Sequence, residues 1–82
     1  MHKSIIVHTF YVTEWEEIVA DISAGSIMYE WEQTPKGQWV LSNSTNPPVW
    51  TRSLSVNQLA YRYVITATFE PKILTEYFLR FA

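Results

Sequence analysis

The chain has 82 residues, a net charge of −2 and no cysteine. This composition excludes a disulfide-stabilised domain, and it lacks the overall basic charge that is typical of nucleic-acid-binding domains. The aromatic residues are four Trp, five Tyr and four Phe. That is a large set of rings for one small domain over residues 1–82, so we expect copies of the chain to bury part of them against one another.

The beginning of the chain lacks the apolar segment and the small-residue cleavage site of a secretory signal. No stretch approaches the roughly 20 apolar residues that are needed to cross a bilayer. We therefore expect an intracellular protein that has no membrane partner.

The first predicted element is a strand over Lys3–Val12, because nearly every residue of this run is apolar or favours strands. One face would carry Ile5, Val7 and Tyr11, and the other Ile6, Phe10 and Val12. Since both faces are apolar, we expect the strand to be covered on both sides, either in the middle of a sheet or at a contact between subunits.

A short helix over Glu14–Ile22 is predicted next. Thr13 and Glu16 have the spacing of a capping box at its start, and Gly25 is a suitable stop. Four apolar residues follow at helical spacing, so we expect them to face inward. These are Trp15, Ile18, Val19 and Ile22.

Two strand-like runs, 27–33 and 38–42, flank the segment Thr34-Pro35-Lys36-Gly37. Proline and glycine at these places favour a hairpin with a three-residue loop, and only that loop separates apolar from polar residues on the two faces. A further short strand is predicted over Val49–Leu54, at an edge of the sheet.

The last predicted hairpin joins Tyr61–Glu70 to Leu74–Phe81 through a turn at Pro71-Lys72. Its buried face would collect the alternate residues of the first arm, Tyr61, Tyr63, Ile65, Ala67 and Phe69. The whole pattern predicts a mainly β domain, a five- to six-stranded antiparallel barrel (Sm/SH3-like or OB-like) with one short helix.

The run Tyr29–Val40 contains the pattern W-x-x-T-x-x-G-x-W-V. Together with Pro48–Trp50, Tyr61–Ile65 and Thr75–Tyr77, it resembles small proteins of unknown function from marine cyanophage-type viruses. The resemblance covers about the C-terminal two-thirds of the chain. It implies a viral protein in the host cytoplasm and an Sm-like small barrel that forms rings and binds RNA or DNA.

Catalysis is poorly supported by the sequence, because no nucleophile, base and orienting acid form a local signature. Glu30 and Glu32 share a strand face in the predicted hairpin, and we interpret them as a solvated surface. His2 and His8 have no metal-binding spacing. We expect no enzyme activity, no cofactor and no metal.

Aromatic residues interleaved with cations are typical of single-strand nucleic-acid binding, in which rings stack on bases and cations contact phosphates. The candidate residues for this role are Trp50, Arg52, Arg62, Lys36 and Lys72. In the alternative interpretation, Tyr61 and Tyr63 face the core and only the cations remain outside.

Five apolar residues are candidates for a contact between subunits, three because they lie on the mixed face of the last hairpin and two because they belong to the first strand, which is apolar on both faces. They are Ile6, Phe10, Val64, Leu74 and Phe78. Alternatively, the predicted helix covers this face. The sequence thus predicts a non-enzymatic homo-oligomer, with a ring as one arrangement, that binds RNA or single-stranded DNA. The alternative is a structural or assembly protein of a virion or complex with no nucleic-acid contact.

Overall fold

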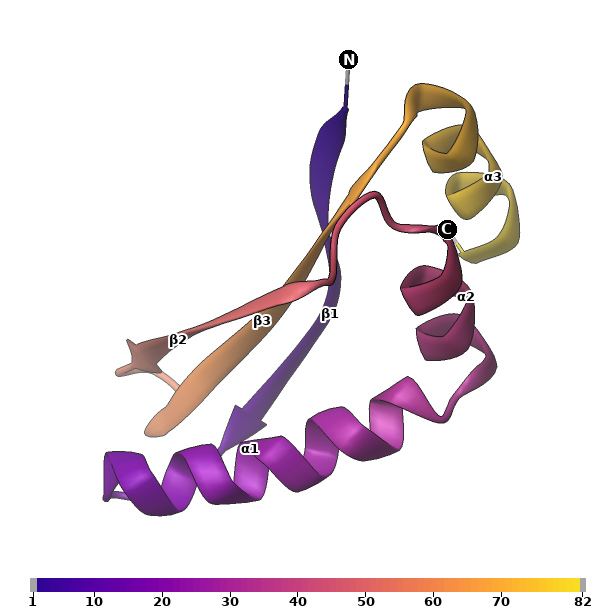
Figure 1. Ribbon diagram of the computed structural model, residues 1–82. Helices are drawn as coiled ribbons and strands as arrows, with labels where there is room; N and C mark the ends of the chain where they lie inside the picture. The colour runs from indigo at the N-terminus through magenta and orange to yellow at the C-terminus, as the bar shows by residue number, and fades with distance from the viewer. Residues whose placement is uncertain (1, 82) are drawn as a thin grey trace.

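The computed structural model describes residues 2–81, which form three helices and an open three-stranded antiparallel sheet (Figure 1). The elements in chain order are β1 (Lys3–Val12), α1 (Glu17–Glu32), α2 (Pro35–Asn43), β2 (Val49–Ser55), β3 (Ala60–Phe69) and α3 (Pro71–Phe81). The strand order is β1-β3-β2. The predicted barrel of five or six strands, whether Sm-like, SH3-like or OB-like, is therefore wrong, and the fold is mixed α/β.

The central strand β3 supplies the middle of the core. Tyr63, Ile65, Ala67 and Phe69 alternate along it, and each is at most 4% exposed. Residues of α1, α2 and α3 pack against these positions, so the three helices cover the same face of the sheet. The prediction that these residues of β3 share one buried face is confirmed.

The predicted hairpin around Thr34-Pro35-Lys36-Gly37 is wrong, because this segment begins the helix α2. The Thr34 hydroxyl accepts a hydrogen bond from the Gly37 amide at 3.0 Å, and Pro35 occupies the first turn. Proline is accepted there because the first amides of a helix have no partner within it. Turn residues and helix-capping residues are the same types, which explains the error.

The same error occurs at the end of the chain, where α3 replaces the predicted second arm of the last hairpin. Pro71 begins this helix. Leu74 and Tyr77 are buried and Phe81 packs against the core, at intervals of three and four residues that place them on one face. In so short a run, the apolar residues fit helical spacing and strand alternation equally well, which explains why the sequence predicted a strand here.

The helix α1 is longer than predicted and is not capped as predicted. Its N-cap is Glu16, which makes no capping bond through its side chain. Gly25 lies within the helix and has no positive φ, so it is not a stop signal. The helix ends beyond it, at Glu32.

Strand β1 is an edge strand with a bulge between Ile6 and His8. The bulge breaks the strict alternation, because an extra residue shifts the remainder of the strand to the other face. As a result Phe10 and Val12 pack in the core, whereas Ile6 and Tyr11 are exposed on the other face. The prediction that β1 is covered on both sides is therefore not met by residues 2–81. The predicted edge position of β2 is confirmed.

The open face of the sheet, opposite the helices, is rich in hydroxyl groups. By the strand register it carries four residues of β1, four of β2 and five of β3. They are Ser4, Ile6, Thr9 and Tyr11, then Val49, Thr51, Ser53 and Ser55, then Ala60, Arg62, Val64, Thr66 and Thr68. None of the helices within residues 2–81 has the length and apolar character to span a bilayer.

Candidate interaction surface

The inner face of α1 is built from small residues in its first half, whereas Trp31 is buried near its end. Ala20 and Ala24 are 0% exposed and lie in one cluster with Val12 and Tyr63. The sheet presents large rings here, including the stacked pair Phe10–Tyr63 at 5.1 Å between centroids. Small side chains let the helix backbone come close to these rings, since interiors fill their space at crystal-like density.

The opposite face of α1 carries large apolar residues that no part of residues 2–81 covers. Ile18, Ile22 and Tyr29 are between 64% and 76% exposed, and Gly25 lies between them at an exposed position. We call these four residues the outer stripe. They follow one another at intervals of four, three and four residues, which keeps them on one side of a helix.

The sequence-based prediction of the inward face of this helix is therefore wrong. All four residues expected to face inward, Trp15, Ile18, Val19 and Ile22, are exposed. The size of the side chains suggested burial, but beside Phe10 and Tyr63 the first half of α1 packs through Ala20 and Ala24 instead. The outer stripe was missed as a surface, although its spacing was visible in the sequence.

A second group of exposed apolar residues lies at the turn between β2 and β3 and beside the start of α1. Trp15 is 83% exposed, and Leu54, Val56 and Leu59 are between 65% and 75% exposed. We call these four residues the tip patch. With Tyr61 they line an open pocket of about 130 Å³, so the tip patch forms one continuous surface that joins the turn to the start of α1.

Leu59 in the tip patch has a backbone conformation that favours glycine or asparagine. Its φ is 51°, in the left-handed region where a bulky residue is strained. Its side chain is exposed, so within this chain neither the backbone nor the packing favours leucine. An apolar side chain held outward in this way is typical of a contact surface.

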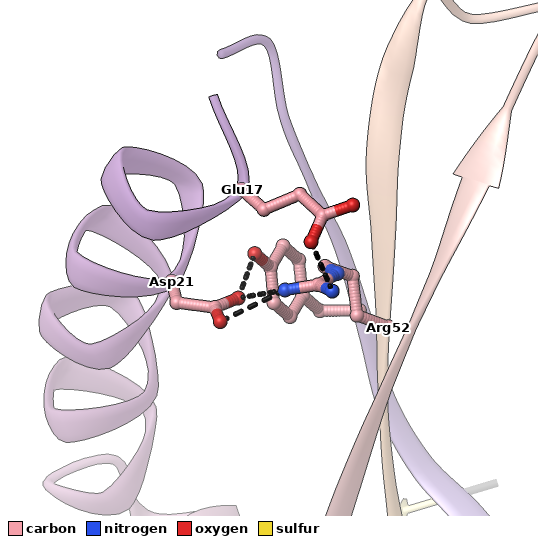
Figure 2. A network of polar contacts seen from close by, with 4 residues as sticks. Glu17, Asp21 and Arg52 are labelled. Atoms are coloured by element: carbon pink, nitrogen blue, oxygen red, sulfur yellow. Dashed lines mark hydrogen bonds and ion pairs between the residues drawn. The ribbon is translucent and has the colours of Figure 1, made fainter. Parts of the chain in front are cut away.

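A polar network fixes how α1 is rotated on the sheet (Figure 2). Arg52 of β2 donates from Nη1 to both carboxylate oxygens of Asp21 at 2.8 Å, and from Nη2 to Glu17 at 3.2 Å. The Tyr63 hydroxyl donates to the same carboxylate of Asp21 at 2.7 Å. Two residues on adjacent turns of α1 are thereby joined to the two strands β2 and β3.

The network shifts the ionisation of its members. Hydrogen bonds from Tyr63 and then from Arg52 lower the pKa of Asp21 below its usual 3.8. Burial, followed by the bond to Asp21, raises the pKa of Tyr63 to about 12. The Asp21 carboxylate is therefore charged and the Tyr63 phenol is neutral near neutral pH. The bonds between them hold α1 in a rotation that turns the outer stripe away from the sheet.

The structure separates the predicted nucleic-acid residues. Arg52 is engaged by Asp21 and Glu17, and the strand register places Arg62 on the opposite face of the sheet. Lys36 lies on α2, over the Tyr77 ring at 5.4 Å. Trp50 is 43% exposed on β2, and Lys72 is exposed in the first turn of α3.

The predicted interface residues are also separated. Phe10 and Leu74 belong to the core. Ile6 and Val64 share the open face of the sheet, where Ile6 is exposed and Val64 is buried among its neighbours. Phe78 is about half exposed on α3.

The residues weighed for chemistry lie apart from one another. His8 stacks on Trp31 at 5.5 Å between ring centroids, and partial burial followed by the charge of Lys36 lowers its pKa. Glu30 is exposed near the end of α1. Over residues 2–81, no three His, Asp or Glu side chains lie close enough to hold a metal ion.

Comparison of the chain with protein-family models, with curated proteins and with solved structures finds no match. The fold and the surface therefore define the class: a three-stranded α/β protein with an uncovered apolar helix face. The resemblance to proteins of marine cyanophage-type viruses stays a prediction.

Proposed function

We propose that this protein acts by assembling with copies of itself through the outer stripe and the tip patch, and not by catalysis. The observation that carries the proposal is that α1 is apolar on two opposite faces, with Ala20, Ala24 and Trp31 buried against the sheet and the large residues of the outer stripe outside. A helix face that carries several large apolar residues is normally buried against another element. Within residues 2–81, only the inner face of α1 is buried.

The size of this surface agrees with the proposal. From their exposed fractions, the large residues of the outer stripe and the tip patch present roughly 700 Å² of apolar surface in each chain. Two chains that cover this surface would bury about 1,400 Å², which lies within the range of stable protein interfaces, about 1,200–2,000 Å².

The open face of the sheet is the other surface that assembly could use. Seven of its residues are Ser or Thr, and among the paired residues of the three described strands Arg62 is the only charged one on this face. A hydroxyl-rich face is typical of an antiparallel sheet that meets water on one side. The open face therefore needs a covering partner less than the outer face of α1 does, so α1 is the better candidate for the assembly surface.

The proposal keeps the assembly function that the sequence predicted and leaves nucleic acid out. Stacking and phosphate contact require rings and cations on one surface. Of the five candidates, Arg52 is paired with carboxylates and Arg62 lies on the opposite face. The ring expected from an Sm-like barrel loses its basis with the barrel.

Sedimentation equilibrium over a wide range of protein concentration tests the proposal. We expect the wild-type mass to rise from 9.6 kDa toward that of an assembly. Ile18→Asp should keep the chain monomeric and folded by circular dichroism, because a charge in a covered apolar surface is strongly unfavourable.

The matched control is Ile6→Asp, which places the same charge at a 55% exposed position on the open face and should leave assembly unchanged. A folded wild-type chain that stays at 9.6 kDa at every concentration would refute the proposal. Loss of assembly in the Ile6 variant alone would also refute it, because the interface would then be the sheet.

A further inference from the structure

We infer that α1 pairs with α1 of a second copy in antiparallel orientation, so that Ile22 of each copy packs against Gly25 of the other. The inference rests on the proposed function and specifies the partner and the geometry of that surface. It follows from three features of the outer stripe: a notch, a self-complementary order of sizes, and the positions of the charges beside it.

Gly25 forms the notch. It lies inside the helix with a negative φ, so the backbone does not require glycine there. A Cβ built at this position would meet no atom within 4 Å, so packing within the chain does not require glycine either. Because glycine weakens a helix relative to alanine, its use on an exposed apolar stripe indicates close approach by another molecule.

Large and small residues of the outer stripe match those of a second copy only when the two helices are antiparallel. In an antiparallel pair centred between Ile22 and Gly25, Ile22 of each copy fills the notch of the other. Ile18 then lies opposite Tyr29, so every large residue has a partner. A parallel pair would set Gly25 against Gly25 and leave a void, which packed interfaces avoid.

The flanks of the outer stripe permit this pairing electrostatically. Helical spacing places five residues beside the stripe, and they are Val19, Asp21, Ser26, Met28 and Glu32. Asp21 and Glu32 are charged, and Arg52 of the same chain already pairs with Asp21 at 2.8 Å. An antiparallel pair sets the two Glu32 side chains at opposite ends of the contact, whereas a parallel pair would set them side by side, so like-charge repulsion also favours the antiparallel arrangement.

Single-cysteine variants test the orientation directly, because the natural chain has no cysteine. Ile18→Cys and Tyr29→Cys proteins are mixed and oxidised, and the disulfide-linked species are identified by mass. We expect the mixed 18–29 species to predominate, since a disulfide requires Cα atoms within about 7 Å. Predominance of the 18–18 and 29–29 species would overturn the inference, because it indicates parallel helices.

Gly25→Leu tests the notch. We expect the dissociation constant of the assembly to rise at least about tenfold while the monomer stays folded, because the new side chain meets nothing in its own chain. The matched control is Ser42→Leu, at an exposed position of α2, which should leave the constant unchanged.

The experiment separates the failure of this inference from that of the proposed function. An assembly that forms equally well with Gly25→Leu and yields no 18–29 species overturns the α1 pairing, although self-association stands. A wild-type chain that is monomeric throughout overturns both.

Discussion

Replacing Ala24 by Leu is the most direct test of which face of α1 packs on the sheet. Ala24 is 0% exposed in the cluster with Val12, Ala20 and Tyr63, so the larger side chain has no free space to occupy. Overpacking of this kind costs about 1–3 kcal/mol, whereas the change in helix propensity costs only about a few tenths. A chain of this length has a total stability of about 4–12 kcal/mol, so the loss is easily measured.

Urea unfolding followed by tryptophan fluorescence provides the assay. With a slope of about 1 kcal/mol per molar urea, Ala24→Leu should lower the midpoint by about 1–3 M. The measurement is made at a protein concentration low enough to keep the chain monomeric, because assembly adds stability.

The matched variant is Ile22→Ala, on the outer face of the same helix. Ile22 is 68% exposed, so its truncation should change the stability of the monomer by no more than about 0.5 kcal/mol. If Ile22 faced the core, its truncation would instead cost about 2–5 kcal/mol. That cost, together with a neutral Ala24→Leu, would refute the packing of α1 described above.

Three further predictions concern the polar network and the two glycines. Tyr63→Phe should cost about 1 kcal/mol in urea unfolding, because it removes the 2.7 Å bond to Asp21 and keeps the ring; an unchanged midpoint would show that the network does not hold α1. Because folding lowers the pKa of Asp21, its contribution to the free energy of unfolding is present above pH 3.8 and is lost as the pH falls through the folded-state pKa. Asp21→Asn should therefore flatten the acid dependence of stability in urea unfolding measured against pH. An equally steep profile in this variant would contradict the prediction. Gly37→Ala should destabilise the fold by more than about 2 kcal/mol, since its Cβ would lie 2.0 Å from the Trp31 carbonyl oxygen. Gly25→Ala should instead stabilise the monomer by about 0.5–1 kcal/mol, because its Cβ meets nothing. Equal effects of the two variants on the thermal midpoint would contradict the packing described for both glycines.

The strands were predictable because their signal is local. The run Lys3–Val12 is the strand β1, Val49–Leu54 lies within β2, and most of Tyr61–Glu70 lies within β3. The buried face of β3 followed from simple alternation. The helices α2 and α3 were mistaken for strands because Pro35 and Pro71 suit a turn as well as a helix start, and the runs that follow are too short for periodicity to decide. The predicted strand over 27–33 is wrong as well, because residues up to Glu32 continue the helix α1.

The surface that carries the proposal was not predictable in the same way. The sequence shows two apolar sets in the first half of α1, one of alanines and one of large residues, and the usual expectation puts the larger set inside. The sheet reverses this choice, because Phe10 and Tyr63 already fill the space that larger helix residues would need. The ion pair of Arg52 with Asp21, 31 residues apart in the chain, then holds that rotation.

Composition and alternation alone thus determined that this chain forms strands with one strongly apolar face and has more large apolar side chains than it can cover. Which of those side chains stay outside was decided only by the tertiary structure. The reason is steric: the volume beneath α1 is shared between helix and sheet, and where the sheet contributes rings, the helix contributes alanine and turns Ile18 and Ile22 outward.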